Sequence, residues 1–228
     1  MAKERIQFEA VTLQATDRYD QEVGGIDVLL RAGECLLIEV EEERGCPPFA
    51  DTAEGLLAPA AGRVRMDGRD WLSLSPDESA AYRSAIGRVF EEQAWVSNLD
   101  VDENVTLAQR HHTGRSEQEI RDEALHWAAR FGWDTLPAIR PAWAPRHELV
   151  IAQWVRALLG APRLMILERP TRDAVDEECG RLVEAVQERR AEGAAVIWLT
   201  SDARLVNNQS LDPRFRAKIL GDRWEILE

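Results

Sequence analysis

The chain has 228 residues, of which 45% are hydrophobic and 30% are charged, and its formal net charge is −13. This composition is typical of a soluble globular protein, and the length suits one large domain or a core with a smaller lobe. The negative charge argues against a nucleic-acid partner and against direct adhesion to an anionic membrane, because both depend on clustered Lys and Arg side chains. The N-terminus lacks the apolar region of a signal peptide, and no apolar run approaches a membrane span. We therefore expect a cytoplasmic chain.

Cysteine and histidine do not form a metal-ligand pattern. The cysteines are Cys35, Cys46 and Cys179, which lie far apart and show no paired spacing. His111 and His112 are neighbours and would point in different directions on a helix. We expect single reduced thiols and no metal site.

The first part of the chain predicts a β-rich region with two short helices. Apolar runs predict strands over residues 6–11, 26–30, 34–40 and 86–90. A short helix is expected over residues 49–57, and Asp67-Gly68 favours a tight turn in a hairpin over residues 62–71. Ser75-Pro-Asp-Glu78 has the residues of a helix start with a capping box.

The middle of the chain predicts helices, and the end returns to strands alternating with helices. Helical patterns cover residues 101–133, 147–160 and 173–191; strands are expected over residues 164–167 and 195–199, with a hairpin over 217–226. This alternation predicts an α/β core, about residues 1–90 and 162–228, with a helical lobe over about 91–161. We expect a single domain over residues 1–228.

The loop after the third expected strand is unusual. Residues 40–48 read VEEERGCPP and stand where many α/β proteins hold phosphate, between a strand and a helix. Such loops offer glycines, backbone N–H groups and a lysine, whereas this one offers three glutamates and two prolines. The local chemistry disfavours phosphate.

The order of segments resembles the nucleotide-binding domain of ABC transporters over nearly the whole chain. The similarity rests on Gly55-Leu-Leu-Ala-Pro with a later Asp67-Gly68, on Ser97-Asn-Leu-Asp-Val-Asp-Glu-Asn-Val105, on Arg156-Ala-Leu-Leu with Leu167-Glu-Arg-Pro-Thr171, and on Leu199-Thr-Ser-Asp202. The resemblance implies a P-loop NTPase-like ABC ATPase core with an antiparallel β subdomain and an inserted helical subdomain.

The resemblance also places the family's nucleotide site on residues that do not suit nucleotide. The Walker A pattern GxxGxGK[ST] and the following hydroxyl position fall on residues that retain one glycine: Val40, Glu43, Gly45, Cys46, Pro47 and Pro48. Cys46 replaces the lysine, and the prolines remove N–H donors at the helix start. Two unit charges about 4 Å apart interact by roughly 4 kcal/mol at an effective dielectric of 20, so the change from lysine toward glutamates opposes phosphate.

The family's other motifs are altered too. Glu91 takes the Q-loop glutamine position, Glu168 the Walker B aspartate and Ser201 the switch histidine. Arg169 replaces the glutamate that polarises water, and a guanidinium cannot act as a general base. The signature segment falls on residues that lack its serine and glycines: Ala144, Pro145, Arg146, His147 and Glu148. Tyr19 is a loosely placed candidate for the adenine-stacking aromatic. We predict no catalytic residue among these positions.

These changes predict a non-hydrolysing ABC-type subunit that is kept for its shape. The resemblance implies a peripheral place on the cytoplasmic face of the inner or plasma membrane, docked on a permease and paired with a competent ABC ATPase subunit or a second copy of itself. The implied docking groove contains Phe90, Trp95, Val96 and Leu99. No cofactor is expected. Two alternatives stay open: an atypical active ATPase, which would use ATP and Mg²⁺, and a soluble regulator that does not meet a membrane.

Overall fold

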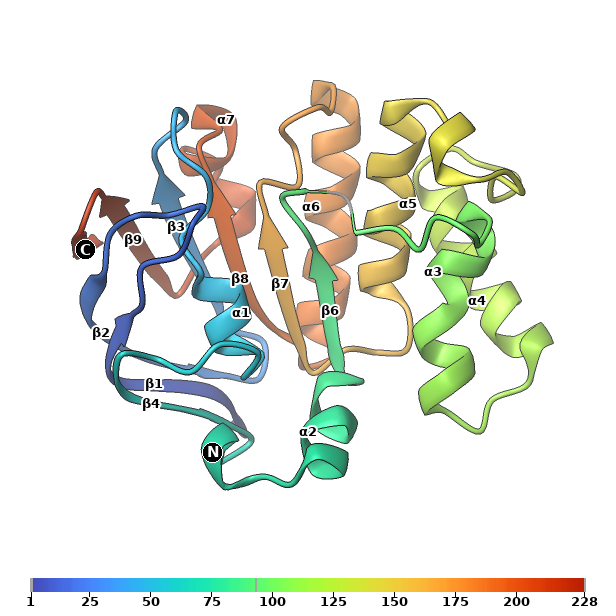
Figure 1. Ribbon diagram of the computed structural model, residues 1–228. Coiled ribbons are helices and arrows are strands. Elements are labelled where there is room, and N and C mark those ends of the chain that lie inside the picture. The colour runs from blue at the N-terminus through green and yellow to red at the C-terminus, as the bar shows by residue number, and fades with distance from the viewer. Residues whose placement is uncertain (1, 93, 228) are drawn as a thin grey trace.

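The structure of the protein is a computed structural model, which describes residues 2–92 and 94–227. Its elements form two sheets and a set of helices gathered on one side (Figure 1). Within those ranges, no helix combines the length and the apolar character needed to cross a membrane.

A six-stranded sheet forms the centre of the molecule, in the strand order β10-β9-β3-β8-β7-β6. Its strands are β3 (Cys35–Val40), β6 (Ile86–Val89), β7 (Leu164–Glu168), β8 (Ala195–Thr200), β9 (Phe215–Leu220) and β10 (Arg223–Leu227). The pairs from β9 through to β6 are parallel, and β10 returns antiparallel to β9. The carboxyl ends of the parallel strands therefore meet at one edge, which is where open α/β sheets place their ligands.

A second, antiparallel sheet has the order β2-β1-β4-β5. Its strands are β1 (Glu4–Leu13), β2 (Val23–Arg31), β4 (Ala61–Met66) and β5 (Arg69–Asp70). The turn between the last two strands uses Asp67 and Gly68 at φ 48° and 80°, as the Asp-Gly pair predicts. The strands of this sheet lie together in the lower left of Figure 1.

Seven α-helices and three 3₁₀ turns lie within the described residues, and two of the helices begin at the predicted caps. They are α1 (Phe49–Ala53), α2 (Pro76–Arg83), α3 (Val101–His112), α4 (Glu117–Arg130), α5 (Arg146–Leu158), α6 (Asp176–Ala191) and α7 (Ala203–Val206), with 3₁₀ turns η1 (Trp71–Ser73), η2 (Pro141–Trp143) and η3 (Gln209–Leu211). Ser75 and Ser116 each form the predicted capping box with the glutamate three residues later.

Four of the predicted helices have different limits in the structure, of which the one expected over residues 147–160 differs least and spans Arg146–Leu158. The helix expected over residues 49–57 ends at Ala53, because Gly55 adopts φ +65° and the N–H of Leu56 bonds back to the carbonyl of Asp51 at 2.9 Å. The stretch over residues 101–133 divides into α3 and α4, because Thr113 is extended. The helix expected from residue 173 begins at Asp176, after an extended Val175.

Two apolar cores lie on the two faces of the central sheet. One contains the buried Trp154 of α5 and Trp198 of β8, and the other joins the central sheet to the antiparallel sheet around Phe8 and Phe49. Gly87 of β6 lets α5 approach closely, since a Cβ there would lie 1.9 Å from the carbonyl oxygen of Ala157. Figure 1 shows α5 and α6 beside the central strands, with α3 and α4 beyond α5. The predicted α/β core with an antiparallel β subdomain and a helical subdomain is confirmed.

Candidate functional site

The carboxyl edge of the central sheet brings together segments that are far apart in the sequence. The loop after β3, the segment after β6, the turn after β7 and the turn after β8 all leave this edge, because these strands are parallel. Glu91, Arg169 and Ser201 follow the last three of these strands. The geometry of the edge therefore places the candidate phosphate loop beside the Q-loop and Walker B equivalents.

The candidate phosphate loop begins at Val40, the buried last residue of β3. Glu41 turns toward the C-terminal hairpin, where its carboxylate accepts a hydrogen bond of 2.8 Å from the N–H of Gly221. Glu42 and Glu43 are exposed. The other half of the loop turns inward, and Cys46, Pro47 and Pro48 are buried. Only the acidic half of this loop faces solvent.

Glu91 contacts the backbone of the candidate phosphate loop through its carboxylate. Its Oε2 accepts a 2.8 Å hydrogen bond from the backbone N–H of Cys46, which stands at the Walker A lysine position. Its Oε1 accepts a 2.8 Å charge-assisted bond from Nη1 of Arg169. The carboxylate thus takes the backbone donor that a phosphate group would need.

Arg169 contacts both Glu91 and the candidate phosphate loop. Its side chain is only 3% exposed, and its Nη2 donates to the carbonyl of Glu41 and, at 2.5 Å, to the carbonyl of Arg44. The residue has φ 44°, a left-handed conformation that is uncommon for a non-glycine residue. Its Nε has no hydrogen-bond partner among the residues described. The guanidinium therefore links the loop to the end of β7 through hydrogen bonds.

Cys46 is poorly suited to chemistry at this position. Burial, with a further contribution from the carboxylate of Glu91, raises the pKa of its thiol well above the usual value. A thiol is nucleophilic as the thiolate, so this cysteine is inert at neutral pH. Nor does it carry the positive charge that a lysine would bring to a phosphate.

Glu168 is also engaged by protein. It lies at the end of β7 and accepts bonds from Arg88 of β6 at 2.8 and 2.9 Å. The same guanidinium contacts Asp51 at 2.7 Å and Glu54 at 2.9 Å. This cluster has three carboxylates and one cation, and it is largely buried. The acid that would support Mg²⁺ is instead held by Arg88.

The proton equilibria of this cluster reflect its excess of carboxylates. Burial raises the pKa of Glu168 to about 7, against the opposing effect of Arg88. Burial also raises the pKa of Glu54. Burial alone would lower the pKa of Arg88, but the surrounding carboxylates outweigh it and the pKa is raised. Arg88 therefore stays charged, while Glu168 titrates near neutrality.

The signature-segment equivalent lies at the start of α5. Pro145 is the N-cap residue and Ala144 precedes it; Arg146, His147 and Glu148 form the first turn. Arg146 pairs with Asp173 at 2.9 Å, and both Arg146 and His147 are exposed. Pro145 has no N–H to offer, and the serine and glycines of the family's segment are replaced by larger groups.

Tyr19 and Ser201 offer little to a nucleotide. Tyr19 is 3% exposed, and its hydroxyl donates to the carbonyl of Gly221 at 2.6 Å, so its ring presents no open face for adenine stacking. Ser201 follows β8 in a small hollow that it shares with Glu42 and Arg204. The neighbouring Asp202 accepts a 3.0 Å bond from the hydroxyl of Thr171.

The residues present do not fit a magnesium nucleotide. A phosphate would have to displace both the Glu91 carboxylate and the Arg169 guanidinium, and a cation at Glu168 would have to displace Arg88. In the described part of the chain, no group of three or more His, Cys, Asp or Glu side chains could hold a metal ion.

A groove lies between the core and the helical lobe, with a volume of ≈ 610 Å³. We call it the lobe groove. Phe90 and Val96 of the predicted docking surface line it. Trp95 lies next to it, under the guanidinium of Arg156 at 4.7 Å, and Leu99 is partly buried, with its N–H bonded to the carbonyl of Val96. The structure thus gathers the first three of these residues around one depression.

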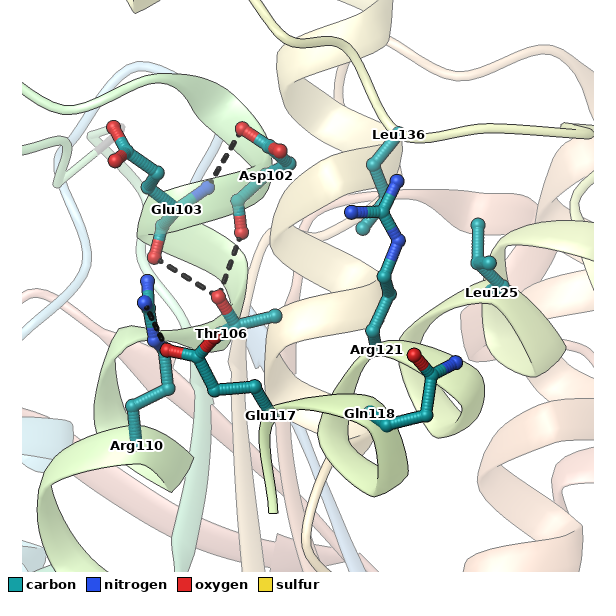
Figure 2. A pocket seen from close by; sticks show the side chains of 9 residues that line it. All are labelled: Asp102, Glu103, Thr106, Arg110, Glu117, Gln118, Arg121, Leu125 and Leu136. Atoms are coloured by element: carbon teal, nitrogen blue, oxygen red, sulfur yellow. Dashed lines mark hydrogen bonds and ion pairs between the residues drawn. The ribbon is translucent and has the colours of Figure 1, made fainter.

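A smaller hollow of ≈ 230 Å³ lies on the helical lobe between α3 and α4 (Figure 2). Figure 2 shows Arg110 and Glu117 paired across one side of it, at 2.6 Å, and the hydroxyl of Thr106 bonded to the backbone of its own helix. Arg110 and Glu117 therefore satisfy each other, and the hydroxyl of Thr106 is satisfied by its own helix. Nothing in the hollow points to a ligand.

Comparison with solved structures decides the fold. The dimeric structure of MJ0796, described as a bacterial ABC transporter cassette, superposes with a TM-score of 0.80 at 20% identity and covers 98% of this chain and 99% of that one. A structure titled as the ATP-binding subunit of an ABC transporter gives a TM-score of 0.79 at 19% identity, covering 98% of this chain and 90% of that one. The chain has the ATP-binding-cassette fold.

Sequence comparison agrees with this fold and relates the chain to ABC transporter ATP-binding subunits. A ribose import ATP-binding protein (RbsA 1) of Rhizobium etli is 28% identical over 179 residues, which are 76% of this chain and 34% of that protein. The arginine/ornithine transport ATP-binding protein AotP of Pseudomonas aeruginosa is 27% identical over 199 residues, which are 81% of this chain and 78% of that protein. The chain spans about a third of the length of the ribose-import relative. No family model matches the chain.

Sequence reasoning missed some of the residues that define this cassette's site. Arg88 and Glu54 organise the buried cluster, and Arg156 lines the lobe groove. A charged residue inside the apolar run over residues 86–90 was a detectable signal for Arg88. No local sequence pattern predicts that Glu54 pairs with Arg88 or that Arg156 lines the lobe groove.

Proposed function

We propose that this chain is a non-hydrolysing ABC-type subunit, used for its shape within a transport assembly. The observation that carries the proposal is the position of Arg169. Its buried guanidinium bonds to Glu91 and to two carbonyls of the candidate phosphate loop, where the family places phosphate. A guanidinium cannot serve as a general base, and the Glu91 carboxylate that it holds would repel a phosphate at the loop.

We further propose that the subunit docks on a membrane permease through the lobe groove and pairs with a competent ABC ATPase subunit or a second copy of itself. Support comes from relatives named as import or transport ATP-binding proteins and from the agreement of the whole fold with ABC cassettes. The proposed location is the cytoplasmic face of the inner or plasma membrane. The proposed direction is import, after the ribose import relative. The names of the two relatives give different cargoes, ribose and arginine/ornithine.

Calorimetry with Mg-ATP tests the non-hydrolysing role. The purified intact chain should give no heat of binding in the micromolar range and no phosphate release. A dissociation constant near 1 μM, which corresponds to about −8 kcal/mol, would contradict the proposal and favour an atypical ATPase.

Copurification tests the docking role. The tagged chain, expressed in its native cell, is recovered from detergent-solubilised membranes, and the bound proteins are identified by mass spectrometry. We expect a permease in the eluate. Recovery of the chain without any membrane protein contradicts docking and favours a soluble regulator.

A further inference from the structure

The contact between Glu91 and the candidate phosphate loop has the form of a ligand bound in a site. The two carboxylate oxygens are used separately: Oε2 accepts the backbone N–H of Cys46 and Oε1 accepts Nη1 of Arg169, each at 2.8 Å. The two donors belong to different parts of the fold, the loop after β3 and the turn after β7, while Glu91 follows β6. One planar carboxylate therefore bridges donors from two separate segments.

Both donors are held in place by contacts that do not involve Glu91. Nη2 of Arg169 donates to the carbonyls of Glu41 and Arg44, which fixes the direction of the guanidinium. The side chain of Arg169 is 3% exposed, and its Nε has no hydrogen-bond partner within residues 2–92 and 94–227. Cys46 is buried. Donors that are already fixed lose little freedom when an acceptor binds to them.

The charges around Glu91 favour an anion at this position. Nη1 of Arg172 lies 4.0 Å from Oε1 of Glu91, so the guanidinium groups of Arg169 and Arg172 both face one carboxylate. The neighbouring Glu92 has a cation of its own, because it pairs with Arg18 at 2.8 Å. Removal of the Glu91 carboxylate would therefore leave a buried guanidinium and a backbone donor without their acceptor.

A hollow gives solvent access to this position. It has a volume of ≈ 380 Å³, and its lining includes Glu91, Arg169 and Arg172. One water molecule needs about 10–15 Å³ of such space, so the hollow admits a small organic acid. The side chain of Glu91 is itself 19% exposed. A small molecule can therefore reach the place of the carboxylate without opening the core.

We propose that the N–H of Cys46 and the guanidinium of Arg169 form a carboxylate-binding site whose resident ligand is the side chain of Glu91. In the intact chain, Glu91 is an autoinhibitory contact that excludes free anions. When its carboxylate is removed, the site binds a small free carboxylate through the same two donors. The inference rests on the proposed non-hydrolysing role and deepens it, because it states what the altered loop binds in place of phosphate.

The site suits a carboxylate better than a phosphate. A guanidinium N–H and one backbone N–H match the two oxygens of a planar carboxylate. Phosphate loops instead surround the phosphate with several backbone N–H groups. Pro47 and Pro48 supply none, and Glu42 and Glu43 of the same loop are exposed acids. Acetate and inorganic phosphate are therefore the two probes that distinguish these kinds of recognition.

Thermal unfolding of the full-length Glu91→Ala chain tests the site, with sodium acetate compared against sodium chloride at equal ionic strength. In chloride, this variant should unfold about 10 °C below the parent chain, because Arg169 is left buried and unpaired. Acetate at about 100 mM should raise the midpoint by about 4 °C, as expected for a dissociation constant of about 10 mM. Inorganic phosphate at the same ionic strength should raise it by less than about 1 °C.

Two control variants and one spectroscopic measurement locate the effect. Glu92→Ala is the matched control, because Glu92 is the next residue and its side chain is 69% exposed. Acetate should stabilise neither this variant nor the parent chain more than chloride does. The double variant Glu91→Ala/Arg169→Met lacks both charges and should not respond to acetate. In the NMR spectrum of Glu91→Ala, added acetate should move the Cys46 amide proton toward its position in the parent chain, which general stabilisation would not do.

The possible results decide the proposal without reference to nucleotide. Absence of stabilisation of Glu91→Ala by acetate, or equal stabilisation of Glu92→Ala, overturns the site. A response that persists in the double variant overturns the role of Arg169, and an equal response to phosphate overturns the preference for carboxylates. If Glu91→Ala does not stay folded in chloride, the folded fraction after dilution from urea is compared in acetate and in chloride, and equal fractions overturn the site. Failure here leaves the non-hydrolysing role intact, because the Mg-ATP measurement decides that role separately.

Discussion

Nη1 of Arg169 lies 2.8 Å from Oε1 of Glu91, and the other oxygen of that carboxylate accepts the backbone N–H of Cys46. This arrangement reproduces inside the protein the contact of an anion with a phosphate loop. It explains how the loop keeps an ordered course with Gly45 as its single glycine. The arrangement depends on a buried ion pair. Removing only one partner of such a pair strongly destabilises a protein, because the other charge is left buried and unpaired.

Arg169→Met should therefore lower the free energy of unfolding by about 3 kcal/mol, since it leaves Glu91 facing the loop without its buried partner. Chemical denaturation measures the change. The matched control is Arg172→Met, because Arg172 is 48% exposed and lies 4.0 Å from the same oxygen of Glu91. The control should change stability by less than about 1 kcal/mol. Equal effects of the two variants would contradict the structural role of Arg169.

Glu168 predicts a specific dependence of stability on pH. Its pKa is raised to about 7 in the folded chain, above the ordinary 4.5, so the folded state binds the proton more tightly than the unfolded state does. The resulting stabilisation is fully present below pH 4.5 and is lost as the pH rises through 7. The loss should be on the order of 3 kcal/mol, because each pKa unit corresponds to about 1.36 kcal/mol.

Glu168→Gln removes this titration while keeping the side-chain shape. Between pH 5 and pH 8, the unfolding free energy of this variant should fall less than that of the parent chain, as measured by urea denaturation at each pH. Glu117→Gln is the control, because Glu117 is 82% exposed, and it should leave the pH profile unchanged. Parallel profiles for Glu168→Gln and the parent chain would contradict the raised pKa.

The fold could be predicted from the sequence because the residues that begin helices and form turns in the cassette are still present. The capping boxes at Ser75 and Ser116 and the Asp67-Gly68 turn set element limits through local hydrogen bonds, which short sequence patterns predict well. The end of α1 was misplaced, because its termination depends on the backbone conformation of Gly55. Local sequence patterns predict the backbone conformation of a single glycine less well than they predict a capping box.

The candidate site was predictable by position but not by contact. The resemblance to ABC nucleotide-binding domains assigned Cys46, Glu91 and Arg169 to one site, whereas their mutual hydrogen bonds join residues 45 and 78 positions apart. Whether a carboxylate and a guanidinium satisfy each other or remain open to a ligand depends on side-chain direction. Sequence spacing does not specify that direction, so the ion pair that closes the site emerged only from the structure.

Restoring the lysine alone should not create a nucleotide site. In Cys46→Lys, the new ammonium group would lie beside Glu91 and find its partner there, because the Cys46 N–H is already 2.8 Å from that carboxylate. Pro47 and Pro48 would still withhold N–H donors. Calorimetry should detect no Mg-ATP binding in the micromolar range, as for the parent chain. Micromolar binding by this variant would show that one residue, and not the closed loop, excludes nucleotide.

Trp143 should contribute to pairing with a second ABC subunit. It is 79% exposed in η2, directly before the signature-segment equivalent, and large exposed aromatic side chains are frequent interface anchors, so the proposed pairing gives this side chain a role. Trp143→Ala should change the unfolding free energy by no more than about 0.5 kcal/mol, because the side chain buries little in the free chain.

The same variant should weaken association, whether with a second copy or with a copurified ATPase subunit, as measured by sedimentation velocity. Leu72→Ala is the control, because Leu72 is 70% exposed in η1 and lies outside the signature-segment equivalent. It should leave association unchanged. Since both substitutions remove exposed apolar side chains, a general loss of surface apolarity would weaken both variants alike, and that outcome would contradict a specific contact through Trp143.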